Sequence, residues 1–299
     1  MATVSRSNET DAPASLRFGR GRPPLDDRSS LESVHPALRI ARGNLDRLAE
    51  FVTAELGIRM PESKLSMIQG RLAHRLRDLG LESLDHYCEH LFSSEGRETE
   101  HAHFIDAVTT NKTDFFRERQ HFDHLIATVL PKLTGPGMPA CNRSIAVWSA
   151  ACASGEEPYT LAMVLSDYAL ARPAFDFGIL ATDVSSKVLQ MAVDGIYAKP
   201  SIAPVPPALR RRYFLQGKGG EPPSVRIKPA LRPKVGFHQL NFMNADCGVR
   251  KIFDVIFCRN VLIYFDRATQ QAVIGKLCRN LNRGGFISRR SPDTNRHES

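Results

Sequence analysis

The chain has 299 residues, of which 42% are hydrophobic and 24% are charged, and its formal net charge is +8. These proportions are those of an ordinary globular protein with one large domain or two smaller ones. No apolar run approaches the roughly 20 residues that span a bilayer. The amino terminus lacks the apolar core of a secretory signal, which favours the cytoplasm. The positive charge favours an acidic partner and leaves nucleic acid, acidic protein and anionic membrane open.

The amino-terminal third is expected to hold a tail and a small helical domain. Residues 1–34 are rich in Ser, Pro, Gly and Arg without periodicity, which predicts a disordered tail. Residues 35–110 carry apolar residues at helical spacing, which predicts an all-α domain of about four helices.

One of these helices presents a basic ridge. At about 100° per residue, Lys64, Arg71 and Arg75 fall within about 40° of one another beside the apolar stripe. Such a ridge suits an acidic helix or a phosphate backbone. An ordinary solvated face is the alternative, and charge alone favours it.

Residues 111–299 change to alternating strands and helices. An apolar strand, a loop of small residues and a helix follow one another in SIAVWSAACASGEEPYTLAM, and FGILATDVSSKVLQMAV repeats that order. FDVIFCRNVLIYF adds a strand and ATQQAVIGKLCRNL a helix. This alternation predicts βαβ units in a doubly wound parallel sheet. Residues 119–133 are expected to form a helix broken near Pro131.

A proline-rich stretch interrupts this alternation at about residues 200–238. The short β-like runs SVRIK and KVGFH lie near the Gly-rich turn GKGGE and follow it in the sequence. We expect a small antiparallel β insertion that contains both runs.

The loop at residues 149–159, SAACASGEEPY, is the strongest chemical signal. Its small residues let a ligand approach the backbone after a first strand, but it lacks the GxGxxG pattern of nicotinamide-binding proteins. Glu156 and Glu157 would repel a pyrophosphate and attract a cation. The ammonium and sulfonium of S-adenosylmethionine fit these charges. Acids at a helix start also complement the helix dipole, which explains the charges without explaining the loop.

Three further segments supply polar groups at predicted strand ends or domain junctions. Asp183 ends the second strand, where a carboxylate accepts ribose hydroxyls or caps the next helix. TTNKTDFFRE, residues 109–118, lies at the domain junction and brings Arg117, whose donor fork suits a carboxylate. In FCRNVLIYF, residues 257–265, the usual Asn/Asp-Pro-Pro-aromatic motif of amino-group methyltransferases is absent.

In this order and spacing, the motifs closely resemble the chemotaxis receptor methyltransferase family, the CheR-type protein-glutamate O-methyltransferases. The resemblance runs over residues 36–286 and includes TTNKTDFFRE, WSAACASGEEPYTLAM, ATDVSSKVLQMA, DGIYAKPSI, LNFM and FDVIFCRNVLIYFD. It implies an α/β, Rossmann-like class I methyltransferase domain with an amino-terminal all-α domain and a small antiparallel insertion. The implied cofactor is S-adenosylmethionine, which leaves as S-adenosylhomocysteine, and the implied products are glutamate methyl esters used in sensory adaptation.

The resemblance also assigns residues. It gives cofactor contacts to Asn111, Thr113, Arg117, Glu157, Asp183, Asn241, Phe242, Arg259 and Asn260. It places Arg117 and Tyr264 beside the transferring methyl group. It makes Lys64, Arg71 and Arg75 the docking ridge for the helical cytoplasmic region of chemotaxis receptors, and the insertion a site for a receptor's carboxy-terminal peptide.

The implied protein is a cytoplasmic monomer recruited to receptor arrays, without nucleic-acid binding, membrane insertion or a metal. Its six cysteines form no CxxC pair and no zinc-finger cluster, so they are expected to be buried free thiols. LNRGGF is expected to end the last helix, and the polar, basic ISRRSPDTNRHES that follows indicates missing closing strands, with a frameshift or truncation as the favoured cause. The alternatives are an inactive SAM-binding adaptor, a nucleic-acid methyltransferase and, more remotely, a nicotinamide oxidoreductase.

Overall fold

The computed structural model describes residues 40–289 except 138–139, 141–142, 218, 220–221 and 246–247, and it does not describe the side chains of residues 62, 63, 65 and 66. The expected tail, Cys141, Cys247 and the end of the chain after residue 289 lie outside the described residues.

The first described region is an all-α unit. Its helices are α1 (Arg42–Leu56), α2 (Glu62–Leu79), α3 (Leu84–Phe92), α4 (Ser94–Thr99) and α5 (His101–Val108). Gly57 and Gly80 end the first two helices with φ of 67° and 65°, a left-handed conformation that glycine adopts readily. Leu48, Leu72 and Tyr87 are buried in a core that these helices share. The expectation of about four helices is off by one, because the backbone at Glu100 separates α4 from α5.

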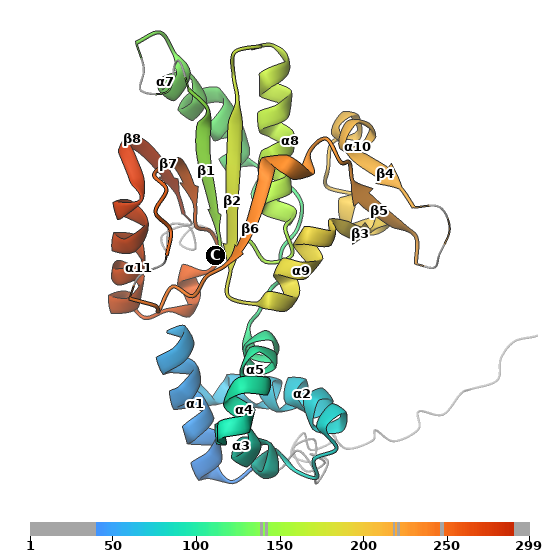
Figure 1. Ribbon diagram of the computed structural model, residues 1–299, viewed down its shortest axis with the longest axis vertical. Coiled ribbons are helices and arrows are strands. Elements are labelled where there is room, and N and C mark those ends of the chain that lie inside the picture. Colours follow the sequence, from blue (N-terminus) through green and yellow to red (C-terminus); the bar gives the residue numbers. More distant parts are fainter. Residues whose placement is uncertain are drawn as a thin grey trace, which may run out of the picture. The chain divides into compact units, whose positions relative to one another are not determined.

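The second region is built on a parallel sheet (Figure 1). In the described part of the chain this sheet has the order β6-β2-β1-β7-β8. Its strands are β1 (Ile145–Ala150), β2 (Phe177–Asp183), β6 (Val235–Gln239), β7 (Phe253–Phe257) and β8 (Leu281–Ser288). All of the ladders between them are parallel, which confirms the Rossmann-like prediction.

Helices cover both faces of the sheet. Three of them are α8 (Glu156–Leu170), α9 (Ser186–Asp194) and α11 (Arg267–Arg279). A further helical segment precedes β1 and consists of α6 (Gln120–His124), a π-helical turn at Leu125–Val129 and α7 (Leu130–Thr134). Val147 of β1 packs in the core with Leu161 of α8, whereas Trp148 packs on the opposite face with Leu277 of α11. Alternate side chains of a strand point to opposite faces, so every residue of β1 is buried. The predicted interruption near Pro131 is a wider helical turn, which accommodates the missing proline N–H.

The small antiparallel sheet is present, but one expected strand is not part of it. It has the order β3-β5-β4, from β3 (Ile196–Ala198), β4 (Phe214–Gln216) and β5 (Ser224–Ile227), with α10 (Pro207–Tyr213) between the first two. KVGFH instead forms β6, the edge of the main sheet. It pairs in parallel with β2 because its alternate residues Val235 and Phe237 fit the main core.

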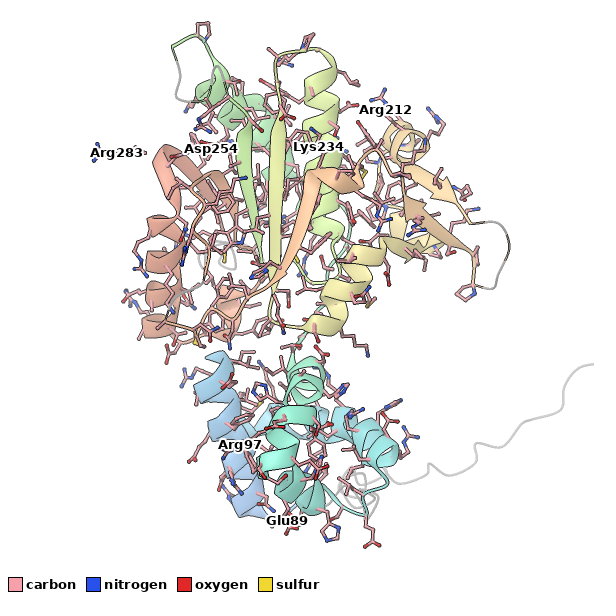
Figure 2. All side chains as sticks on the ribbon, viewed as in Figure 1. Glu89, Arg97, Arg212, Lys234, Asp254 and Arg283 are labelled. Atoms are coloured by element: carbon pink, nitrogen blue, oxygen red, sulfur yellow. The ribbon has the colours of Figure 1, made fainter. Side chains whose placement is uncertain are left out.

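The carboxy-terminal prediction also needs correction. α11 ends at Arg279, and LNRGGFIS forms β8 instead of prolonging the helix. Gly284 has φ of 76° and the ladder to β7 shifts register after Phe253, so the two glycines form an irregularity within a strand. Asp254, labelled in Figure 2, lies near the amino ends of the strands and accepts hydrogen bonds from Arg143, Ala146 and Asn282.

Candidate active site

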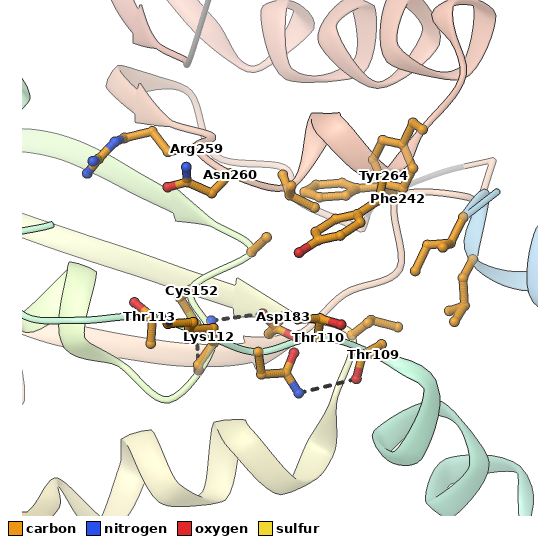
Figure 3. A pocket seen from close by; sticks show the side chains of 18 of the residues that line it. Thr109, Thr110, Lys112, Thr113, Cys152, Asp183, Phe242, Arg259, Asn260 and Tyr264 are labelled. Atoms are coloured by element: carbon orange, nitrogen blue, oxygen red, sulfur yellow. Dashed lines mark hydrogen bonds between the residues drawn. The ribbon is translucent and has the colours of Figure 1, made fainter. Parts of the chain in front are cut away.

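The carboxyl ends of β1, β2 and β7 border one cavity, whose empty space, together with the solvent at its open side, is about 1220 Å³. Parallel strands present their carboxyl ends at the same edge, which is where open α/β sheets bind ligands. The residues predicted from the sequence for cofactor and methyl transfer all line this cavity: Asn111, Thr113, Arg117, Glu157, Asp183, Asn241, Phe242, Arg259, Asn260 and Tyr264. Figure 3 shows Thr113 and Asp183 on one side of it, with Arg259, Phe242 and Tyr264 across from them.

Backbone strain is concentrated around the cavity. In the described part of the chain, five non-glycine residues have positive φ: Phe116, Glu118, Ala151, Ala153 and Asn260. They belong to the segments 116–118, 151–153 and 260, which adjoin or line the cavity. A non-glycine residue in this conformation costs about 1 to 3 kcal/mol, and such residues cluster where binding or catalysis requires a fixed backbone. The strain therefore marks the same place as the motifs.

Glu157 offers a carboxylate to the cavity from a side chain that is 14% exposed. Its Oε1 accepts a hydrogen bond from Ser149 Oγ at 2.8 Å, and its Oε2 lies 3.2 Å from Arg259 Nη1. Burial raises the pKa of Glu157, and Arg259 opposes that rise. A buried carboxylate with only part of an arginine as counter-charge is a site for a cation.

Glu156, the other half of the predicted acidic pair, does not line the cavity. It is 8% exposed and accepts a hydrogen bond from Ser154 Oγ at 2.7 Å. Burial raises the pKa of Glu156 as well. Successive residues of a helix point in directions about 100° apart, so Glu157 lines the cavity and Glu156 does not.

Asp183 is held by the backbone at the end of β2. Its Oδ2 accepts from the N–H of Ala153 at 2.9 Å and its Oδ1 from the N–H of Ser185 at 3.0 Å. Burial raises the pKa of Asp183, against the effect of these N–H groups. Each carboxylate oxygen keeps further acceptor capacity, so Asp183 suits a pair of hydroxyl donors.

Arg259 and Asn260 are tied to a residue that the sequence did not single out. Glu118 Oε2 lies 3.0 Å from Arg259 Nη2, and Glu118 Oε1 accepts from Asn260 Nδ2 at 3.1 Å. Arg259 Nη2 also donates to the carbonyl of Arg117 at 2.6 Å. Ser149 was missed too. Ser149 could have been noticed as a polar residue inside an otherwise apolar strand. Glu118 could have been noticed as an acid directly after a predicted site arginine.

The segment 109–118 crosses the cavity. Asn111 Nδ2 donates to Thr109 Oγ1 at 3.2 Å, and Arg117 Nη1 donates to the carbonyl of Lys112 at 2.7 Å. Phe115 contacts Tyr197 and Phe214 edge to face, with centroid distances of 4.9 and 5.5 Å. The two phenylalanines therefore pack, as expected, while the polar residues between and around them line the cavity.

Asn241 lines the cavity, and its side chain also makes two hydrogen bonds within the protein. Its Nδ2 donates to the carbonyl of Glu55 at 2.8 Å, and its Oδ1 accepts from the N–H of Met243 at 2.9 Å. Asn241 thus connects the end of α1 to the turn that positions Phe242. Phe242 lies next to Tyr264 in Figure 3, so an aromatic wall closes this side of the cavity.

Family models match both regions of the chain. The "CheR methyltransferase, SAM binding domain" covers residues 111–288, and the "CheR methyltransferase, all-alpha domain" covers residues 43–109. The chain belongs to the CheR methyltransferase family.

Relatives named as chemotaxis protein methyltransferases cover most of the chain. One from Borreliella burgdorferi is 38% identical over 84% of this chain and 87% of its own length. One from Klebsiella aerogenes is 35% identical over 87% of this chain and 86% of its own length. One from Escherichia coli is 34% identical over 88% of each.

The CheR cavity of this chain fits S-adenosylmethionine, the cofactor of the family model. Glu157 and Asp183 present carboxylates to this cavity. Arg259 Nε is buried without a hydrogen-bond partner among the described residues, so an acceptor on a bound ligand would complete it. The donors and acceptors therefore match a zwitterionic amino acid joined to a nucleoside.

The three ridge residues of the CheR α2 helix are not equivalent. Lys64 lines the cavity, with its Nζ 5.2 Å from the ring centre of Tyr264. Arg71 Nη1 donates to the carbonyls of Ala107 and Thr109 at 3.2 and 2.8 Å. Arg75 makes two hydrogen bonds to Glu100, a residue that is 1% exposed. Uniform helical spacing put these residues on one face, but the charge of Arg75 is largely neutralised inside the helical region.

Proposed function

We propose that the chain transfers a methyl group from S-adenosylmethionine to glutamate side-chain carboxylates of chemotaxis receptors, giving glutamate methyl esters for sensory adaptation. The observation that carries this proposal is the cavity itself, where the buried carboxylates of Glu157 and Asp183 face Arg117 and Tyr264. The names of the relatives support the choice of chemotaxis proteins as substrates.

Different residues contact different parts of the cofactor. Glu157 holds the ammonium, Asp183 accepts the ribose hydroxyls, and Phe242 covers the adenine. Asn111, Thr113, Asn241, Arg259 and Asn260 complete the contacts with the cofactor. When bound, the cofactor supplies an electrophilic methyl group on a sulfonium.

The acceptor needs orientation more than activation. A glutamate carboxylate is already ionised at neutral pH, so the site requires no general base. Arg117 orients the carboxylate through its donor fork and Tyr264 fixes its approach, while the aromatic wall excludes water. Arg117 also donates to the carbonyl of Lys112, so part of its hydrogen-bonding capacity is already used. A loose contact of this kind leaves the carboxylate nucleophilic, because a tightly paired ground state would slow the transfer.

The proposed partners are the receptor regions that the resemblance to this family implies. The helical cytoplasmic region of a receptor docks at α2, with Lys64 nearest to the cavity, and a receptor's carboxy-terminal peptide docks at the sheet β3-β5-β4. The protein acts as a cytoplasmic monomer recruited to receptor arrays. Among the described helices, none is long and apolar enough to cross a membrane.

The test is methyl transfer from radiolabelled S-adenosylmethionine to membranes that contain chemotaxis receptors, with RNA as a second acceptor. We expect base-labile label on receptor protein and none on RNA. Label on RNA would overturn the choice of substrate. Cofactor binding without any transfer would favour the alternative of a docking or adaptor protein.

A further inference from the structure

Glu118 is placed to organise the cofactor side of the cavity, although it does not line the cavity itself. Its two carboxylate oxygens contact different residues of the segment after β7, at 3.0 Å from Arg259 Nη2 and 3.1 Å from Asn260 Nδ2. Both Glu118 and Asn260 have positive φ, 52° and 57°. Two strained residues that face each other through one carboxylate indicate a contact that the fold maintains for a purpose.

Arg259 is shared between two acids. Its side chain is 2% exposed and contacts Glu118 at 3.0 Å and Glu157 at 3.2 Å. One guanidinium therefore serves two carboxylates, which leaves a surplus of one negative charge. Burial opposes ionisation of Glu118, but the hydrogen bonds from Arg259 and Asn260 outweigh it and hold the pKa of Glu118 below its usual range.

The neighbouring histidine does not cancel this surplus. His121 Nε2 lies 3.4 Å from Glu118 Oε2. Burial, followed by repulsion from Arg259, lowers the pKa of His121. His121 is therefore mainly neutral at neutral pH, and the surplus charge stays with the two glutamates.

We propose that Glu118 is a positioning residue that holds Arg259 and so leaves Glu157 free to bind the ammonium of the cofactor. The inference rests on the proposed function, because it assigns the ammonium to Glu157. Without the Glu118 charge, Arg259 would pair fully with Glu157, and the ligand would have to displace a buried arginine from its only acid. Glu118 thus acts on the ligand through Arg259 and touches no reacting atom.

The inference predicts an effect that is confined to the amino-acid end of the ligand. Two probes separate that end from the nucleoside: S-adenosylhomocysteine carries the ammonium, and 5′-methylthioadenosine lacks the whole amino-acid group. Calorimetry on the full chain should show that Glu118→Gln lowers the affinity for S-adenosylhomocysteine about tenfold or more. The affinity for 5′-methylthioadenosine should fall by less than about twofold.

Two further variants guard against a general loss of structure. Glu118→Asp keeps the charge on a shorter arm and should restore part of the affinity for S-adenosylhomocysteine. Asp123→Asn also removes one negative charge, from a 64% exposed side chain five residues away. It should leave the affinity for both ligands unchanged. Thermal melting of each variant reports the fold independently of binding.

Equal losses for both ligands with Glu118→Gln, or no loss for either, would overturn the inference. A Glu118→Asp variant that binds S-adenosylhomocysteine as weakly as Glu118→Gln would overturn it as well. The shape of the side chain, and not its charge, would then determine the affinity. Failure of the unsubstituted chain to bind S-adenosylhomocysteine would overturn the proposed function itself, and this inference with it.

Discussion

The hydroxyl of Tyr197 on β3 donates a 2.8 Å hydrogen bond to the backbone carbonyl of Ser154 in the loop between β1 and α8. The small antiparallel sheet is thereby joined to the loop that presents Glu157. Phe115, from the segment that crosses the cavity, packs on the same tyrosine. The small antiparallel sheet therefore also supports the loop and the segment that line the cavity.

Gly155→Ala should damage this junction. Gly155 has φ of 97°, and an added Cβ would lie 2.8 Å from Ala192 Cβ and 2.9 Å from the Tyr197 hydroxyl oxygen. We expect a loss of about 2 kcal/mol or more in unfolding free energy, from backbone strain plus crowding. Gly80→Ala is the matched control, because Gly80 also has positive φ, at 65°, but has nothing within 4 Å of an added Cβ. Chemical denaturation of both variants measures the difference, and equal losses would mean that crowding at Gly155 is absent.

Glu157→Gln should remove cofactor binding while leaving the fold intact. The variant loses the buried charge opposite the ligand ammonium, so affinity for S-adenosylhomocysteine should fall by about a hundredfold or more. The unliganded variant should melt no lower than the unsubstituted chain, because burial makes the ionised Glu157 costly in the fold, as its raised pKa indicates. Calorimetry and thermal melting test the two statements. Glu156→Gln, on a carboxylate turned away from the cavity, should reduce binding much less.

Affinity should also depend on pH through the same group. Only the ionised carboxylate attracts the ligand ammonium, and burial raises the pKa of Glu157. Binding of S-adenosylhomocysteine should therefore weaken as the pH falls, beginning above the pH at which an ordinary glutamate titrates, about 4.3. Titrations across this range should show proton release on binding, since a bound cation lowers the pKa of its partner acid. Binding that is independent of pH down to 4.5 would contradict this role of Glu157.

Arg117→Ala should separate transfer from binding. If Arg117 orients the acceptor carboxylate, its loss should lower methyl transfer about a thousandfold and change the affinity for S-adenosylhomocysteine much less. Transfer to receptor membranes and calorimetry measure the two quantities. Equal losses in both would assign Arg117 to the cofactor alone.

The residues that the sequence singled out line one cavity, whereas some of the expected strands lie elsewhere in the fold. Strand ends that carry polar residues after apolar runs, such as Asp183 and Arg259, lie together because parallel strands share an edge. KVGFH was misplaced because a short alternating run fits an antiparallel hairpin as well as a parallel edge strand. Only its pairing with β2 decides between them.

The contacts within the site were less predictable. Sequence spacing put Lys64, Arg71 and Arg75 on one helical face, but it did not reveal Glu100, 25 residues from Arg75, as a buried partner. Glu118 was missed for a similar reason, because its contacts with Arg259 and Asn260 span about 140 residues. Long-range pairing of charges depends on tertiary structure and leaves no local pattern.

The different surroundings of Lys64 and Arg75 predict different phenotypes. Lys64→Ala should lower kcat/KM for receptor methylation about tenfold with unchanged affinity for S-adenosylhomocysteine, because Lys64 lines the cavity and its ammonium lies over the ring of Tyr264. Arg75→Ala leaves Glu100 buried without its cation and should cost about 3 to 5 kcal/mol of stability. Kinetics and denaturation distinguish the two. A stable Arg75→Ala protein with impaired methylation would support the predicted role of Arg75 in receptor docking.

Asp254 should make the stability of the sheet region depend on pH. Its side chain is 1% exposed, and burial alone would raise its pKa. Hydrogen bonds from Arg143, from the N–H of Ala146 at 2.9 Å and from Asn282 at 2.8 Å outweigh burial, so the pKa of Asp254 lies below its usual range. A depressed carboxyl pKa stabilises the fold above the unfolded pKa of about 3.9, and this contribution is lost as the pH falls through the folded value.

Asp254→Asn should therefore lower the melting temperature by about 5 °C or more at pH 7, since the variant breaks a buried ion pair. The difference in melting temperature between the variant and the unsubstituted chain should become smaller below about pH 4, because both proteins then lack the charge at this position. Melting curves at several pH values test both expectations, with Asp123→Asn as an exposed control whose gap should stay small throughout. A gap for Asp254→Asn of the same size at pH 7 and pH 3 would mean that the aspartate stabilises this end of the sheet through the shape of its hydrogen bonds and not through its charge.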